Sequence, residues 1–83
     1  MNALERAFEF AEQQWRENVD RNVMVALTGG HPGLKPRHVR LCRDKDGLYV
    51  RLGKRGQMKK YLKDMAGARI VDADLRLAVF YEV

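Results

Sequence analysis

Small hydroxyl and thiol side chains are scarce in this chain, which has no serine, one threonine and one cysteine in 83 residues. The absence of serine excludes acyl transfer by a serine nucleophile. The single Cys42 cannot form a disulfide within the chain, and no charged and then apolar leader begins the sequence, so we expect a cytoplasmic protein. No apolar run exceeds the five residues of 23–27, whereas a membrane span needs roughly 20. We therefore expect no contact with a membrane.

Residues that could act in catalysis or bind a metal do not occur in a suitable arrangement. His38 and Cys42 are four positions apart, which on a strand leaves their side chains about 13 Å apart, too far for one to activate the other. Together with His31 they are also too few and too scattered for a closed zinc site. Asp72 and Asp74 are interpreted as turn residues rather than as a cation site. We expect a protein that is not an enzyme and that holds no metal and no cofactor.

An amphipathic pattern near the start of the sequence predicts a helix. Its apolar residues recur at spacings of four, three, four and four: Leu4, Phe8, Ala11, Trp15 and Val19. Glutamates occupy the opposite face of this helix. Phe10 lies outside the apolar stripe, so we expect its side chain to be exposed.

Residues 23–27 are apolar and largely β-branched and follow a polar break, which predicts a strand covered on both faces. The alternative is that residues 19–28 extend the first helix to a cap at Gly29. That helix would distribute its apolar side chains around the whole circumference, which argues against it. Residues 28–36 hold three glycines and both prolines and are predicted to form the main loop.

Residues 37–52 alternate in polarity around an Asp-Lys-Asp-Gly turn and predict a hairpin. The register in which Leu41 faces Val50 collects the apolar side chains on one face, whereas a slip of one residue splits them between the two faces. The favoured register also places Arg40 directly opposite Arg51 on the other face.

The segment after the hairpin has the spacing of a second helix over residues 58–65. Apolar side chains fall at i, i+3, i+4 and i+7: Met58, Tyr61, Leu62 and Met65. Gly67 is positioned to end this helix. Residues 68–71 are interpreted as a short strand, residues 72–74 as a turn, and the alternating residues 75–83 as a further strand.

These elements follow the order α-β-β-β-α-β-β. The order predicts an α+β fold with a mostly antiparallel sheet of four to five strands and two helices on one of its faces. A chain of 83 residues is long enough for one domain, so we expect residues 1–83 to form a single unit.

Positive charge is concentrated in the middle of the chain. Residues 35–63 carry a net charge of +9, whereas residues 1–20 carry −3 and residues 64–83 carry −2. Within the basic segment we expect one anion-binding surface, composed of Arg40, Arg43, Tyr49, Arg51, Lys54, Arg55, Lys59, Lys60 and Lys63.

The basic segment predicts contact with nucleic acid or with a nucleic-acid-protein complex. Like charges meet at Arg40 and Arg51 on the hairpin and at Lys59 and Lys63 on the predicted helix, and a phosphate between them would relieve the repulsion. Tyr49 is expected to be available for stacking on a base. The simpler interpretation is a solvated basic surface that discourages pairing between sheet edges.

The alternative function is that of a small protein-binding inhibitor or adaptor. Phe10 and Phe80 are expected to be exposed and to serve as contacts for a protein partner. Small domains without catalytic residues are common among phage and mobile-element products, some of which block a host enzyme or a CRISPR complex. The sequence leaves open the identity of the partner, the choice between DNA, RNA and an acidic protein surface, and the choice between monomer and homodimer.

Overall fold

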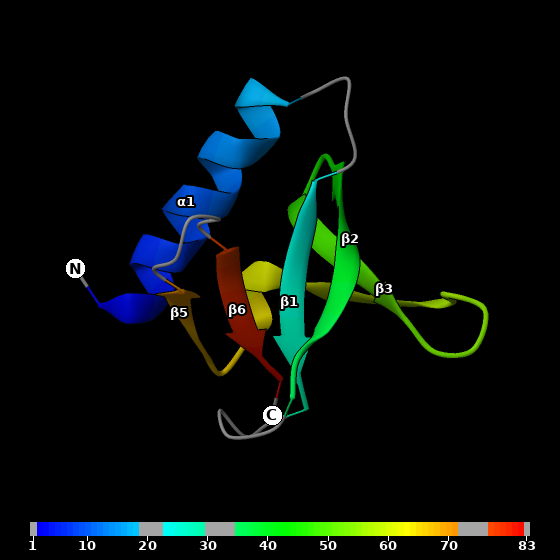
Figure 1. The fold of residues 1–83 in the computed structure, drawn as a ribbon. Helices are drawn as coiled ribbons and strands as arrows, with labels where there is room; N and C mark the ends of the chain where they lie inside the picture. The colour runs from blue at the N-terminus through cyan, green and yellow to red at the C-terminus, as the bar shows by residue number, and fades with distance from the viewer. Residues whose placement is uncertain (1, 19–22, 30–34, 72–76, 83) are drawn as a thin grey trace.

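The described chain forms an α+β fold in which one helix packs on a mixed sheet of six strands (Figure 1). The computed structural model describes residues 2–18, 23–29, 35–71 and 77–82. The sheet order is β4-β3-β2-β1-β6-β5. The elements in chain order are α1 (Ala3–Glu17), β1 (Met24–Thr28), β2 (Arg37–Asp44), β3 (Gly47–Leu52), β4 (Met58–Tyr61), the 3-10 turn η1 (Leu62–Asp64), β5 (Gly67–Val71) and β6 (Leu77–Tyr81).

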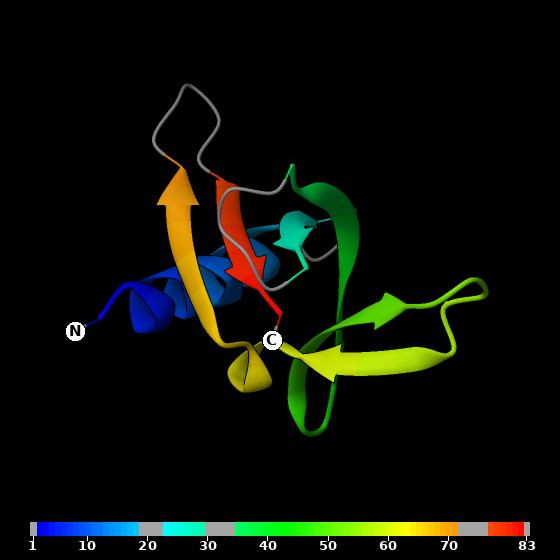
Figure 2. The same cartoon turned by 90° about the horizontal axis from the view of Figure 1, so that it is seen from below.

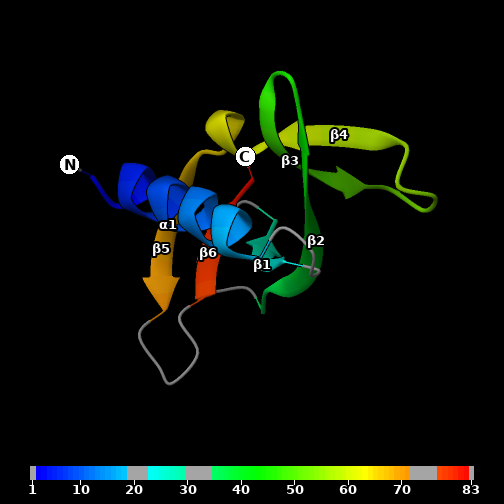
Figure 3. The ribbon, with the colours of Figure 1, turned by 90° about the horizontal axis from the view of Figure 1, so that it is seen from above.

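The first helix lies where the sequence predicts it, but its fully buried residues are Ala7 and Ala11, and the predicted Val19 lies outside the described residues. Asn2 caps its start, because the Asn2 side-chain oxygen accepts a hydrogen bond from the Glu5 backbone N–H at 2.8 Å. Ala7 and Ala11 are fully buried where α1 lies across β5 and β6 (Figure 3). Small side chains on this face allow the helix to approach the sheet closely.

The segment after the helix is a strand, as predicted, and does not extend α1. β1 pairs in antiparallel fashion with β2 and in parallel fashion with β6. Val25 and Leu27 point toward the core under the helix, while Ala26 and Thr28 are buried on the opposite face. The sheet is mixed, because the β1–β6 pair is parallel and the other four strand pairs are antiparallel. The predicted count of four to five strands is wrong, since residues 58–61 add a sixth strand. Residues 19–22 and 30–34 of the predicted break and loop lie outside the described residues.

The hairpin of β2 and β3 has the predicted register, with Leu41 opposite Val50, but it is shorter than predicted. β2 curves strongly along its length (Figure 2) and changes partner, so that its first half pairs with β1 and its second half with β3. The expected Arg40–Arg51 pair is therefore wrong. Arg40 lies opposite Met24, and Arg51 lies opposite Lys59.

The predicted second helix is also wrong. Residues 58–61 form the edge strand β4, and the 3-10 turn η1 follows. Leu62 and Met65 are buried, as predicted. A single turn is enough to bring both side chains to the core, and it is closed by a hydrogen bond of 3.1 Å from the Met65 N–H to the Leu62 C=O. Met58 is 57% exposed. A helix of eight residues with adjacent lysines at its start is marginal, whereas pairing with β3 supplies hydrogen bonds at once.

The last two strands lie where the sequence predicts them, but the predicted division into buried and exposed side chains is wrong. Gly67 does not end a helix; it begins β5 opposite Tyr81 of β6. On β6, Phe80 is fully buried beneath α1 with Ala78, so its expected exposure is wrong. Phe10 is half-buried and packs against the core rather than standing exposed. The predicted turn at residues 72–74 lies outside the described residues.

Candidate nucleic-acid interface

The ladder between β3 and β4 gathers aromatic and cationic side chains on one face of the sheet. Tyr49 lies opposite Tyr61, and Arg51 lies opposite Lys59, so these four side chains project on the same side. Lys63 of η1 reaches the same place from the next element. This basic face consists of Tyr49, Arg51, Lys59, Tyr61 and Lys63.

Each cation of the basic face lies over a tyrosine ring. The Lys59 ammonium is 4.6 Å from the centre of the Tyr49 ring, and the Arg51 guanidinium carbon is 5.5 Å from the same centre. The Lys63 ammonium is 5.2 Å from the centre of the Tyr61 ring. The two rings are tilted by 57° with their centres 5.7 Å apart. The electron-rich ring faces attract the cations and hold them together despite their like charge.

One carboxylate, Asp44 at the end of β2, anchors this arrangement. Its Oδ2 accepts hydrogen bonds from the Tyr61 hydroxyl at 2.6 Å and from Lys59 at 3.0 Å. The Tyr61 hydrogen bond, assisted by Lys59 and by the Asp46 backbone N–H, lowers the pKa of Asp44 to about 2, although burial opposes the shift. The same hydrogen bond, with burial, raises the pKa of Tyr61 to about 12. At neutral pH Asp44 is therefore ionised and Tyr61 protonated.

The turn between β3 and β4 carries two further exposed cations, Lys54 and Arg55. It lies at the end of the molecule away from α1 (Figure 1 and Figure 3). Gly53 and Gly56 have φ angles of +90° and +64°, which side chains other than glycine rarely adopt. Arg51 stabilises the turn, because its Nη1 donates a hydrogen bond to the Gly56 carbonyl at 3.2 Å.

The structure does not unite all the cations that the sequence predicted in one surface. Arg43 points toward α1 and forms an ion pair with Glu12 at 3.4 Å. Lys60 lies opposite Val50, on the face of the β3–β4 ladder away from the tyrosines. Arg40 is exposed on the half of β2 that pairs with β1. These three cations therefore lie outside the basic face.

Two residues of this site were missed from the sequence, and one was misinterpreted. Tyr61 was assigned to the apolar stripe of a helix, and Asp44 was regarded only as a turn residue. An antiparallel pairing of residues 58–61 with 49–52 would have identified both, because it places Tyr61 beside Tyr49 and within reach of the turn. Tyr49 is only 7% exposed, so the expectation that its ring is available for stacking is wrong.

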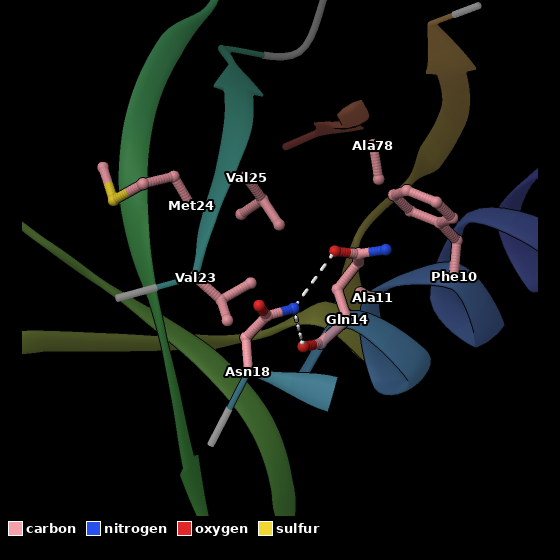
Figure 4. A pocket seen from close by; sticks show the side chains of 8 residues that line it. All are labelled: Phe10, Ala11, Gln14, Asn18, Val23, Met24, Val25 and Ala78. Atoms are coloured by element: carbon pink, nitrogen blue, oxygen red, sulfur yellow. Dashed lines mark hydrogen bonds between the residues drawn. The ribbon is translucent and has the colours of Figure 1, made fainter. Parts of the chain in front are cut away.

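A separate pocket of about 190 Å³ lies between the C-terminal half of α1 and the start of β1 (Figure 4). Phe10, Val23 and Val25 supply apolar walls. At its rim the Asn18 amide donates to the backbone oxygen of Gln14 at 3.0 Å and to the Gln14 side-chain oxygen at 3.4 Å. The pocket is smaller than the roughly 300 Å³ at which sites for drug-sized ligands begin. Phe10 lines this pocket, so its side chain is only partly covered by protein atoms.

Comparison with models of protein families, with curated proteins and with solved structures finds no match to this chain. No helix among the described residues has the length and apolar character required to cross a membrane.

Proposed function

We propose that this protein binds nucleic acid through the basic face and the adjoining turn between β3 and β4. The observation that carries the proposal is a local excess of positive charge. The basic face and the turn carry five cations, Arg51, Lys54, Arg55, Lys59 and Lys63, and the carboxylate of Asp44 contacts one of them. In the described part of the chain, Lys59 is the only one of these five that forms an ion pair with a carboxylate. The remaining charge is available to phosphate groups, which dominate the affinity of proteins for nucleic acids.

The arrangement of the cations supports this proposal over a solvated surface. Arg51, Lys59 and Lys63 are held over tyrosine rings on one face of the sheet. These side chains therefore lose less conformational entropy when they bind a phosphate than freely rotating cations would lose. Their charged groups remain accessible, since all three residues are exposed. Lys54 and Arg55 extend the positive surface into the turn.

The experiment is a fluorescence anisotropy titration of a labelled oligonucleotide of about 20 base pairs at salt concentrations from about 50 to 200 mM. We expect the wild-type affinity to fall steeply and linearly on a log–log scale. The variant Lys54→Gln/Arg55→Gln should bind more weakly, and the slope should decrease by about 0.9 for each phosphate that the variant no longer neutralises.

The matched control is Arg6→Gln/Arg69→Gln. These arginines are exposed beside β5, at the opposite edge of the sheet from β4, and their replacement changes the net charge by the same amount. We expect the control variant to keep the wild-type salt slope. Equal losses of affinity in the two double variants would mean that net charge alone, and not this surface, determines binding.

Absence of oligonucleotide binding by the wild type at about 50 mM salt would refute the proposal. The alternative, a protein-binding inhibitor or adaptor, would then be favoured. It has less support from the described surface than it had from the sequence, because Phe80 is fully buried and Phe10 half-buried.

A further inference from the structure

The aromatic side chains of this protein are covered, and this limits the kind of nucleic acid that the basic face can hold. All seven lie in described segments, and each is buried or half-buried. The large apolar side chains that are exposed in these segments are the methionines Met24 and Met58. Proteins that bind single strands without sequence preference depend on exposed aromatic rings on which successive bases stack.

Within the basic face the cations themselves block stacking. Lys59 and Arg51 both lie over the Tyr49 ring, and that residue is 7% exposed. The half-buried Tyr61 has Lys63 over its ring, and its hydroxyl is bound to Asp44. A base could reach either ring only after a cation had left it. The cation would then also be displaced from the place where it can contact a phosphate.

We infer that the ligand of the basic face is double-stranded nucleic acid, held by its phosphates and not by stacked bases. This inference rests on the proposed function and deepens it. Without stacking, affinity depends on the density of phosphate charge, which is higher along a duplex than along a single strand. A duplex also presents its phosphates on a rigid outer surface, which matches cations that are themselves held in place on a sheet.

The test compares three labelled ligands of equal length: a DNA duplex, an RNA duplex and a pyrimidine-rich DNA single strand that cannot fold. We expect both duplexes to bind more tightly than the single strand at about 50 mM salt, where the contribution of the phosphates is large. For equal numbers of neutralised phosphates, the log–log salt slopes of the DNA duplex and the single strand should stand in a ratio of about 0.9 to 0.7. The tighter of the two duplexes identifies the source of the phosphates as DNA or RNA.

The outcomes separate this inference from the proposed function. A single strand that binds as tightly as the duplexes, or more tightly, overturns the inference and leaves the proposed function intact. Failure of all three ligands to bind overturns both.

A variant tests whether the cations over the tyrosine rings cause the preference for a duplex over a single strand. Lys63→Gln removes the cation over the Tyr61 ring, so the ratio of duplex affinity to single-strand affinity should fall as the ring becomes accessible. Lys60→Gln removes the same charge from the opposite face of the ladder, where no tyrosine lies among the described residues of that ladder, and should keep the wild-type ratio. An unchanged ratio in Lys63→Gln would show that the covering cations do not determine the choice of ligand.

Discussion

The hydroxyl of Tyr61 donates a hydrogen bond to Asp44 at 2.6 Å and so joins the edge strand β4 to the end of β2, across the intervening strand β3. The bond requires an ionised Asp44 and a protonated Tyr61, and their pKa values of about 2 and about 12 keep them in these states at neutral pH. Neither partner of this hydrogen bond therefore changes its charge over the physiological range. Phosphate binding at this face should change little between about pH 6 and pH 8, and oligonucleotide titrations at both pH values would check this.

The pH dependence of stability should show both shifts. The pKa of Asp44 is lowered from 3.8 to about 2, so its stabilising effect is complete above pH 3.8 and is lost as the pH falls toward 2. The pKa of Tyr61 is raised from 10.0 to about 12, so its effect is complete below pH 10 and is lost as the pH rises toward 12. Tyr61→Phe should reduce the loss of stability that this pair causes at acid pH and should abolish the loss of stability that it causes at alkaline pH. Melting temperatures measured in both pH ranges would test this, and superimposable profiles for the two proteins would contradict it.

Phe80→Ala and Phe10→Ala should differ in their cost to stability. Phe80 is fully buried in the core, so its truncation should cost about 3–5 kcal/mol, a large part of the stability of a domain of this size. Phe10 is half-buried beside a pocket, so its truncation leaves less of a new cavity and should cost clearly less. Urea unfolding provides the measurement. Equal costs would contradict the assignment of Phe80 to the buried face of β6.

Gly56→Ala should destabilise the turn that presents Lys54 and Arg55. Alanine at the φ angle of +64° found at Gly56 costs about 1–2 kcal/mol, although no close contact opposes the added carbon. Gly29→Ala is the matched control, because its φ angle is not positive and the added carbon meets no atom within 4 Å. Denaturant unfolding should therefore distinguish the two variants, and a cost at Gly29 equal to that at Gly56 would be the contrary result.

Arg43→Gln should leave oligonucleotide binding close to that of the Arg6→Gln single variant. Arg43 lies among the cations of the central segment but points toward α1, where it pairs with Glu12 on an exposed surface. The loss of such a pair should change stability by less than about 1 kcal/mol. A fall in affinity as large as that of Lys63→Gln, measured at the same salt concentration, would show that the interface extends around the edge of the sheet.

The sequence predicted the elements whose pattern is local, namely the first helix, the strand at residues 23–27 and the register of Leu41 with Val50. It failed where the choice depended on distant partners. The apolar spacing at residues 58–65 fits a helix equally well, and only the pairing of residues 58–61 with residues 49–52 makes the start of this segment a strand. Similarly, both faces of β6 carry apolar residues, so its polarity pattern could not reveal that Phe80 lies under α1. The bend that separates Arg40 from Arg51 arises from the partner change of β2.

The parallel pairing of β1 with β6 has a consequence for the order of events during synthesis. Ala26 pairs with Val79, far along the chain, and β6 lies between β1 and β5 while contributing Phe80 to the core. As the chain emerges from the ribosome, α1 and β1 have no completed surface to pack on until residues 77–81 have been released. Contacts between such distant segments close slowly, because the entropy of a long loop is lost before any contact forms. The sheet around β1 should therefore close only after residues 77–81 have been made, and until then β1 has β2 along one edge while its other edge stays unpaired.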